Sequence, residues 1–79
     1  MNTLFKIGQY TFLKNRDVLV KIVNITSTSI DYKIVKEDGS LSELIIIDPY
    51  QYAIKNLLST EPVMMTLKEV KLNYPEYFI

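Results

Sequence analysis

The chain has 79 residues, of which 48% are hydrophobic, and its nine basic and nine acidic side chains give a formal net charge of zero. It contains no histidine and no cysteine, which excludes imidazole bases, thiol nucleophiles, disulfide frameworks and Cys/His metal sites. The length predicts one domain over residues 1–79, and a domain of this size has only a thin core to bury.

The neutral charge also bears on partners and location. A dedicated nucleic-acid-binding protein usually carries a basic excess, because phosphate neutralisation supplies much of its affinity. No apolar run approaches the ~20 residues needed to span a bilayer, and the first six residues do not have the pattern of a signal peptide. We therefore expect a cytoplasmic protein, and the frequent Ile, Lys and Asn suggest a bacterial or phage origin.

Four segments have the character of β-strands: residues 5–13, 18–25, 30–36 and 41–47. The first is interrupted near Gly8. The second is apolar at both parities, which is typical of a strand covered on both faces. The third alternates between apolar and polar residues, so one of its faces should meet the core.

The third and fourth segments flank Asp38-Gly39. This dipeptide is typical of a hairpin with a type I′ turn, which needs positive φ at both central residues. The return strand contains the run Leu44-Ile45-Ile46-Ile47. We expect this run to be central or covered, since an exposed edge of that composition promotes aggregation.

A helix is predicted over residues 49–59. Asp48 is suited to cap its N-terminus and Pro49 to its first position. Apolar residues then recur at helical spacing and form a single stripe. The stripe consists of Tyr50, Ala53, Ile54, Leu57 and Leu58.

The last segment has two interpretations. Thr66 and Glu69 have the spacing of a capping box, which favours a short helix over residues 66–74 that ends before Pro75. The alternative is a strand over residues 63–72. We favour the helix.

Together these elements predict an α+β fold with a four-stranded, mostly antiparallel, bent sheet and two helices. Gly8 near the start of the first strand, the Val/Ile-rich second strand, and residues 30–39 with their Asp38-Gly39 turn resemble SH3-like and Tudor-type small barrels. The resemblance covers about the first half of the chain and implies a partly open barrel. It transfers no ligand and no binding residue.

Aromatic and apolar side chains are the candidates for binding a partner protein, because tyrosine in particular suits half-wet interfaces. The candidates are Tyr52, Tyr74, Tyr77, Phe78 and Ile79. The alternative is that the aromatic C-terminal tail folds back and covers the sheet or the first helix. A tail exchanged with a second copy would instead produce a homodimer.

A basic face is the second candidate site, and its members are Lys14, Arg16, Lys33 and Lys36. The alternative is that these residues only solvate their strands and protect sheet edges. No motif for a catalytic, metal-binding or cofactor-binding site is present. We expect a non-catalytic interaction module that binds another protein or itself, without cofactor or membrane, and a nucleic-acid-binding small barrel is the alternative.

Overall fold

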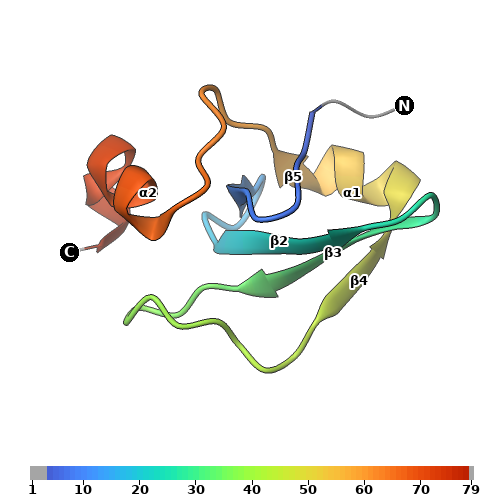
Figure 1. Cartoon of the computed structure of the whole chain (residues 1–79), viewed down its shortest axis with the longest axis horizontal. Coiled ribbons are helices and arrows are strands. Elements are labelled where there is room, and N and C mark those ends of the chain that lie inside the picture. The colour runs from blue at the N-terminus through green and yellow to red at the C-terminus, as the bar shows by residue number, and fades with distance from the viewer. Residues whose placement is uncertain (1–3, 79) are drawn as a thin grey trace.

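The computed structural model describes residues 4–78, which form a curled antiparallel sheet, a half-barrel, with two short α-helices (Figure 1). The strand order is β4-β3-β2-β1-β5, so the sheet has five strands rather than the four predicted. The elements are β1 (Tyr10–Leu13), β2 (Leu19–Ile25), β3 (Ser29–Ile34), β4 (Ile46–Pro49), α1 (Tyr50–Asn56), β5 (Leu57–Leu58), α2 (Leu67–Asn73) and the 3-10 helix η1 (Pro75–Phe78).

The β1–β2 hairpin is central in the sheet, and both of its faces are covered. Because side chains alternate along a strand, Tyr10 and Phe12 point to one face of β1 while Thr11 points to the other, and all three are buried. The register pairs Phe12 with Leu19 and Thr11 with Val20. The prediction that the second strand is covered on both faces is therefore confirmed at its first half.

One core cluster fills the inner, concave face of the sheet. Its buried members are Phe5, Val20, Ile22, Ile30, Tyr32, Ala53 and Leu57. Helix α1 contributes only Ala53 as a fully buried residue, with Tyr50 half-buried beside the cluster. The helix therefore closes the inner face at one end of the sheet.

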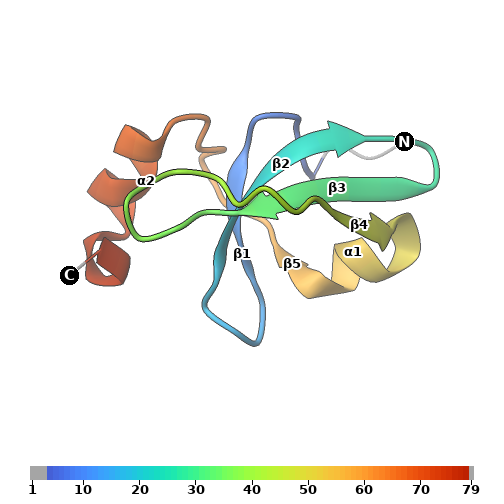
Figure 2. The same cartoon turned by 90° about the horizontal axis from the view of Figure 1, so that it is seen from below.

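A second cluster lies on the outer face and is covered by the C-terminal part of the chain. Its buried members are Tyr10, Phe12, Leu19, Met64 and Val70, with Leu67, Tyr74 and Phe78 packed against them. In Figure 2, α2 and η1 lie at the opposite end of the molecule from α1. The outer faces of β3 and β4 receive neither helix.

The first strand is shorter than predicted, because the segment before it turns. The Gln9 N–H donates to the Lys6 carbonyl, and Gly8 has a φ of 91° that suits glycine. The buried Gln9 side chain accepts from the Lys6 N–H at 3.0 Å and donates to Thr60 Oγ1 at 3.2 Å. This side chain ties the N-terminal turn to the segment after β5, and regular strand structure begins only at Tyr10.

The predicted type I′ hairpin and its long return strand are corrected. Gly39 has a φ of 88°, and Asp17 is the one non-glycine residue with positive φ in residues 4–78, so Asp38 does not meet the type I′ requirement. The Gly39 N–H donates to the Lys36 carbonyl at 2.9 Å, as in a type I turn followed by a left-handed glycine. The return strand is reduced to a Val35–Leu41 bridge, and β4 begins at Ile46.

The first helix is also shorter than predicted. Asp48 does not cap it; the N-cap is Pro49, which has no side-chain hydrogen bond there. Residues 57 and 58 leave the helix and pair as β5 with Leu13 and Phe12 of β1. The fifth strand thus comes from the end of the predicted helix, where pairing with β1 overrides helical periodicity.

The second helix is confirmed. Thr66 Oγ1 accepts from the Glu69 N–H at 3.1 Å and donates to Glu69 Oε1 at 3.0 Å, so the predicted N-terminal signal operates. The strand alternative survives only as one bridge, in which the Tyr10 N–H donates to the Met64 carbonyl.

We predict that Phe12→Ala lowers the free energy of unfolding by about 3–5 kcal/mol, because it opens a cavity where β1, α2 and η1 meet. The check is denaturant unfolding followed by circular dichroism. Leu72→Ala, at an 80% exposed position on α2, is the control and should change this free energy by less than about 0.5 kcal/mol. Equal losses in the two variants would contradict the two-sided core. Phe12→Leu, which leaves a smaller cavity, keeps the comparison measurable if Phe12→Ala does not fold.

Candidate partner-binding surfaces

The aromatic C-terminal tail folds back onto the outer face of β1. The Phe12 ring lies 5.0 Å from the Tyr74 ring and 4.6 Å from the Tyr77 ring, measured between centroids. Phe78 packs against the same cluster, and the Lys71 Nζ lies 5.5 Å from its ring centroid. These aromatic side chains therefore help to build the outer core cluster, and Tyr77 keeps 42% of its surface exposed.

The remaining aromatic and apolar candidates are not brought together with the tail. Ile79 lies outside the described residues. Tyr52 is 53% exposed on α1, at the other end of the molecule from η1 (Figure 2). The predicted partner-binding residues thus do not form one continuous surface in residues 4–78.

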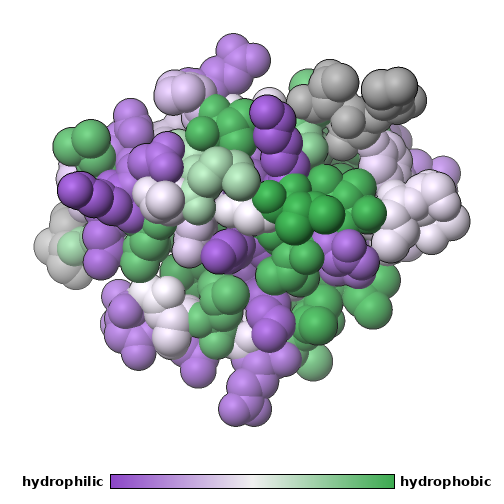
Figure 3. Space-filling view, viewed as in Figure 1, coloured by the Kyte–Doolittle hydropathy of each residue, from purple (hydrophilic) through white to green (hydrophobic). Residues whose placement is uncertain are grey.

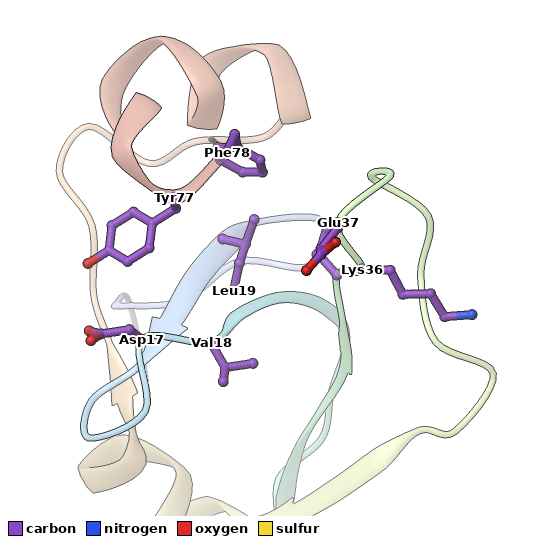
Figure 4. A pocket seen from close by; sticks show the side chains of 8 residues that line it. Asp17, Val18, Leu19, Lys36, Glu37, Tyr77 and Phe78 are labelled. Atoms are coloured by element: carbon purple, nitrogen blue, oxygen red, sulfur yellow. The ribbon is translucent and has the colours of Figure 1, made fainter.

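A cavity of about 320 Å³ opens between η1 and the ends of the central strands (Figure 4). Its lining residues are Asp17, Val18, Leu19, Val35, Lys36, Glu37, Tyr77 and Phe78. Figure 4 shows Asp17 and Glu37 on opposite sides of an apolar floor, while the Lys36 side chain extends away. Partial desolvation and then the Asp17 carboxylate raise the pKa of Tyr77 above its usual range. The rim of this cavity is acidic.

A second cavity, of about 390 Å³, lies at the open side of the half-barrel. It is lined by Leu13, Lys14, Asn15, Arg16, Tyr32, Ile46 and Asn56. Beside it, Asp48 Oδ2 accepts from the Tyr32 hydroxyl and from Asn56 Nδ2, each at 3.1 Å. Asp48 therefore fixes the end of α1 against β3 instead of capping the helix.

The four residues of the predicted basic face are dispersed. Lys14 and Arg16 line the second cavity, and Lys36 lies in the turn after β3. Lys33 of β3 pairs with Lys21 of β2 on the outer face of the sheet. The Lys21 Nζ lies 5.3 Å from the Tyr10 ring centroid. The predicted basic face did not include Lys21. Its position in the Val/Ile-rich second strand was the signal that could have identified it.

Three neighbouring apolar side chains are exposed where the sequence predicted a covered strand. Leu44, Ile45 and Ile47 are 75%, 47% and 68% exposed, and we call these three residues the apolar strip. They belong to β4 and the segment just before it, at the edge of the sheet. Figure 3 shows hydrophobic surface where β4 runs in Figure 1. The prediction that the run 44–47 is central or covered is wrong, because β4 has a neighbouring strand on one side only.

Within residues 4–78, no group of three or more acidic side chains has the arrangement of a metal site. In the same part of the chain, none of the helices is both long and apolar enough to cross a bilayer.

Comparison with known proteins found no matching protein family, no matching curated protein and no matching solved structure. The surfaces of this chain are therefore the basis of the proposed function.

We predict that the Tyr32 phenol of the folded protein ionises near pH 12, well above the usual range of tyrosine. Burial raises the pKa of Tyr32 from 10.0 to about 12, together with the charge of the Asp48 carboxylate, which accepts a hydrogen bond from the Tyr32 hydroxyl; Arg16 partly opposes the shift. Since the folded-state pKa lies above the unfolded value, the associated stabilisation is complete below about pH 10 and is lost as pH rises through about 12. Phenolate absorbance, with circular dichroism at each pH to confirm folding, measures this step.

Two variants make that titration specific. Tyr32→Phe should remove the ionisation step near pH 12 and the loss of stability that this group contributes above about pH 10. Tyr52→Phe, which removes an exposed phenol, should leave that step in place. A step near pH 12 that persists in Tyr32→Phe would contradict the assignment.

Proposed function

We propose that this protein is a non-catalytic interaction module that binds another protein through the apolar strip. The observation that carries the proposal is the exposure of Leu44, Ile45 and Ile47 in one short run at a sheet edge. Single exposed apolar residues are ordinary on protein surfaces, but adjacent ones mark interaction sites. A sheet edge also offers unpaired main-chain groups to an added strand.

The fold supports this role through the place of the strip. The inner and outer core clusters use most apolar side chains of β1 and β2, whereas Ile47 contributes to neither. A small domain gains stability from each buried apolar side chain, roughly 1.5–3 kcal/mol. Surface left exposed in such a chain is therefore available for binding.

Nucleic-acid binding is the second candidate. The cross-strand pair Lys21–Lys33 on the outer face favours it, because like charges that face each other can share an anion. Stacking of bases beside this lysine pair is disfavoured, since Tyr10 and Tyr32 are buried. The formal net charge of zero also disfavours it.

We also propose that the half-barrel is a variant of the SH3-like barrel. The strand order β4-β3-β2-β1-β5, with α1 inserted between β4 and β5, supports this assignment. A cytoplasmic location and a bacterial or phage origin stay predictions from the sequence.

The proposal is tested by placing a charge in the strip. Ile47→Lys should reduce capture of the partner by the immobilised protein at least about tenfold, because a buried ammonium is costly at an apolar interface. The immobilised protein is incubated with an extract of the source organism, and the amount of each retained protein is quantified after gel electrophoresis. Leu72→Lys, at an exposed apolar position on α2, is the matched control and should capture as the unmodified chain does. Equal capture by both variants would contradict the proposal.

The same proteins discriminate the second candidate. In fluorescence anisotropy, we expect no salt-dependent binding to a labelled oligothymidine or to a labelled duplex. Salt-dependent binding that is lost in Lys33→Glu, but kept in Ile47→Lys, would support nucleic-acid binding instead.

A further inference from the structure

The free edge of β4 has a defined pattern of main-chain groups. The Tyr50 N–H donates to the Thr28 carbonyl at 2.8 Å, and the β3–β4 register pairs Ile30 with Asp48 and Asp31 with Ile47. Hydrogen-bonded and non-hydrogen-bonded pairs alternate in an antiparallel ladder, so the N–H and C=O of Ile47 point away from β3. Within residues 4–78, β4 is the edge strand of the sheet, and Figure 1 shows it on the lower border of the molecule.

The side chains beside this edge share one face. Asp31, the partner of Ile47, alternates with the inward residues Ile30 and Tyr32, so Ile47 lies on the outer face. Exposure falls and rises again from Ile45 through Ile46 to Ile47, which places Ile45 on the outer face with Ile47. The edge thus combines outward main-chain groups with two exposed apolar side chains.

We propose that the partner bound at this edge is a second copy of this chain, paired antiparallel β4 to β4, with Ile45 of each copy opposite Ile47 of the other. The inference rests on the proposed function and names its partner. In this register the outward main-chain groups of both residues are satisfied across a two-fold axis at Ile46. The four isoleucines then form one apolar cluster on the outer face of a continuous sheet.

The charges and the turn residues favour this register. The segment paired in this register, residues 45–47, carries no charged side chain, and Glu43 and Leu44 lie in a bend before it. Pro49, which lacks an N–H, lies at the end of the paired segment where its missing donor costs least. A register moved toward α1 would instead place the second strand against the start of the helix at Tyr50.

The charge of the whole chain also favours a second copy. Two identical chains with a formal net charge of zero do not repel each other at long range. Because the paired segment is short, the dimer buries less than the roughly 800 Å² per partner of a standard interface. We therefore expect a dimer with a dissociation constant on the order of micromolar.

The first experiment is sedimentation velocity on the full chain over a concentration range around ~10 µM, at low and high salt. The expected result is a monomer–dimer equilibrium that salt does not weaken, because apolar and main-chain contacts carry it. Ile47→Lys should weaken the dimer at least about tenfold, and Leu72→Lys should not change it. A chain that stays monomeric throughout would overturn the inference.

The second experiment tests the register by disulfide crosslinking. Because the chain has no cysteine of its own, only the introduced cysteines can form a disulfide. Ile45→Cys and Ile47→Cys chains, mixed and oxidised mildly, should form a crosslinked dimer, since directly opposed Cα atoms lie about 5.5 Å apart. Either chain alone should crosslink much more slowly, because identical positions are then roughly 8–9 Å apart. Rapid crosslinking of one chain alone, or none in the mixture, would overturn the proposed register.

Failure of the inference is distinct from failure of the proposed function. A monomeric chain whose capture of another protein is lost in Ile47→Lys, but kept in Leu72→Lys, keeps the interaction module and removes the second copy. A monomeric chain in which neither variant alters capture removes both.

Discussion

The structure depends on the two-sided packing of the β1–β2 hairpin. Because side chains alternate along a strand, Phe12 can be buried only if something covers the outer face, and Val20 only if something covers the inner face. With 79 residues, the chain meets both needs with separate short elements: α1 on the inner face and α2 with η1 on the outer. The C-terminal aromatic residues therefore act first as part of the core.

This use of the helices explains the exposed edge. Helices α1 and α2 have seven residues each, which at 1.5 Å per residue gives about 10 Å of length. Each covers one end of one face, so the outer faces of β3 and β4 stay open. The apolar strip is exposed because none of the elements formed by residues 4–78 covers it, and this links the thin core to the proposed binding function.

Local chemistry predicted much of this fold, and long-range pairing decided the rest. The capping pair Thr66 and Glu69 and the β-branched second strand correctly indicated α2 and β2, because their signals act within a few residues. Leu57 and Leu58 fit a helical stripe, yet they pair with β1, a contact that periodicity cannot encode. The apolar run from Leu44 to Ile47 predicted a buried strand, because composition does not distinguish an edge strand from a central strand of a sheet. The sequence left both core and interface open for the tail, and the position of Phe12 relative to Tyr74 and Tyr77 decides its packing.

An apolar sheet edge would ordinarily invite unlimited association. Here the two edges of the sheet are unequal: β4 has four residues and β5 has two. Head-to-tail growth would need β4 of one copy to pair with β5 of the next, and so short a strand gives few main-chain bonds. Pairing of β4 with itself uses the longer edge twice and leaves no apolar edge of equal length. Pro49 and the immediate start of α1 then limit slippage, so the sequence that exposes the strip also favours a closed dimer over a fibre.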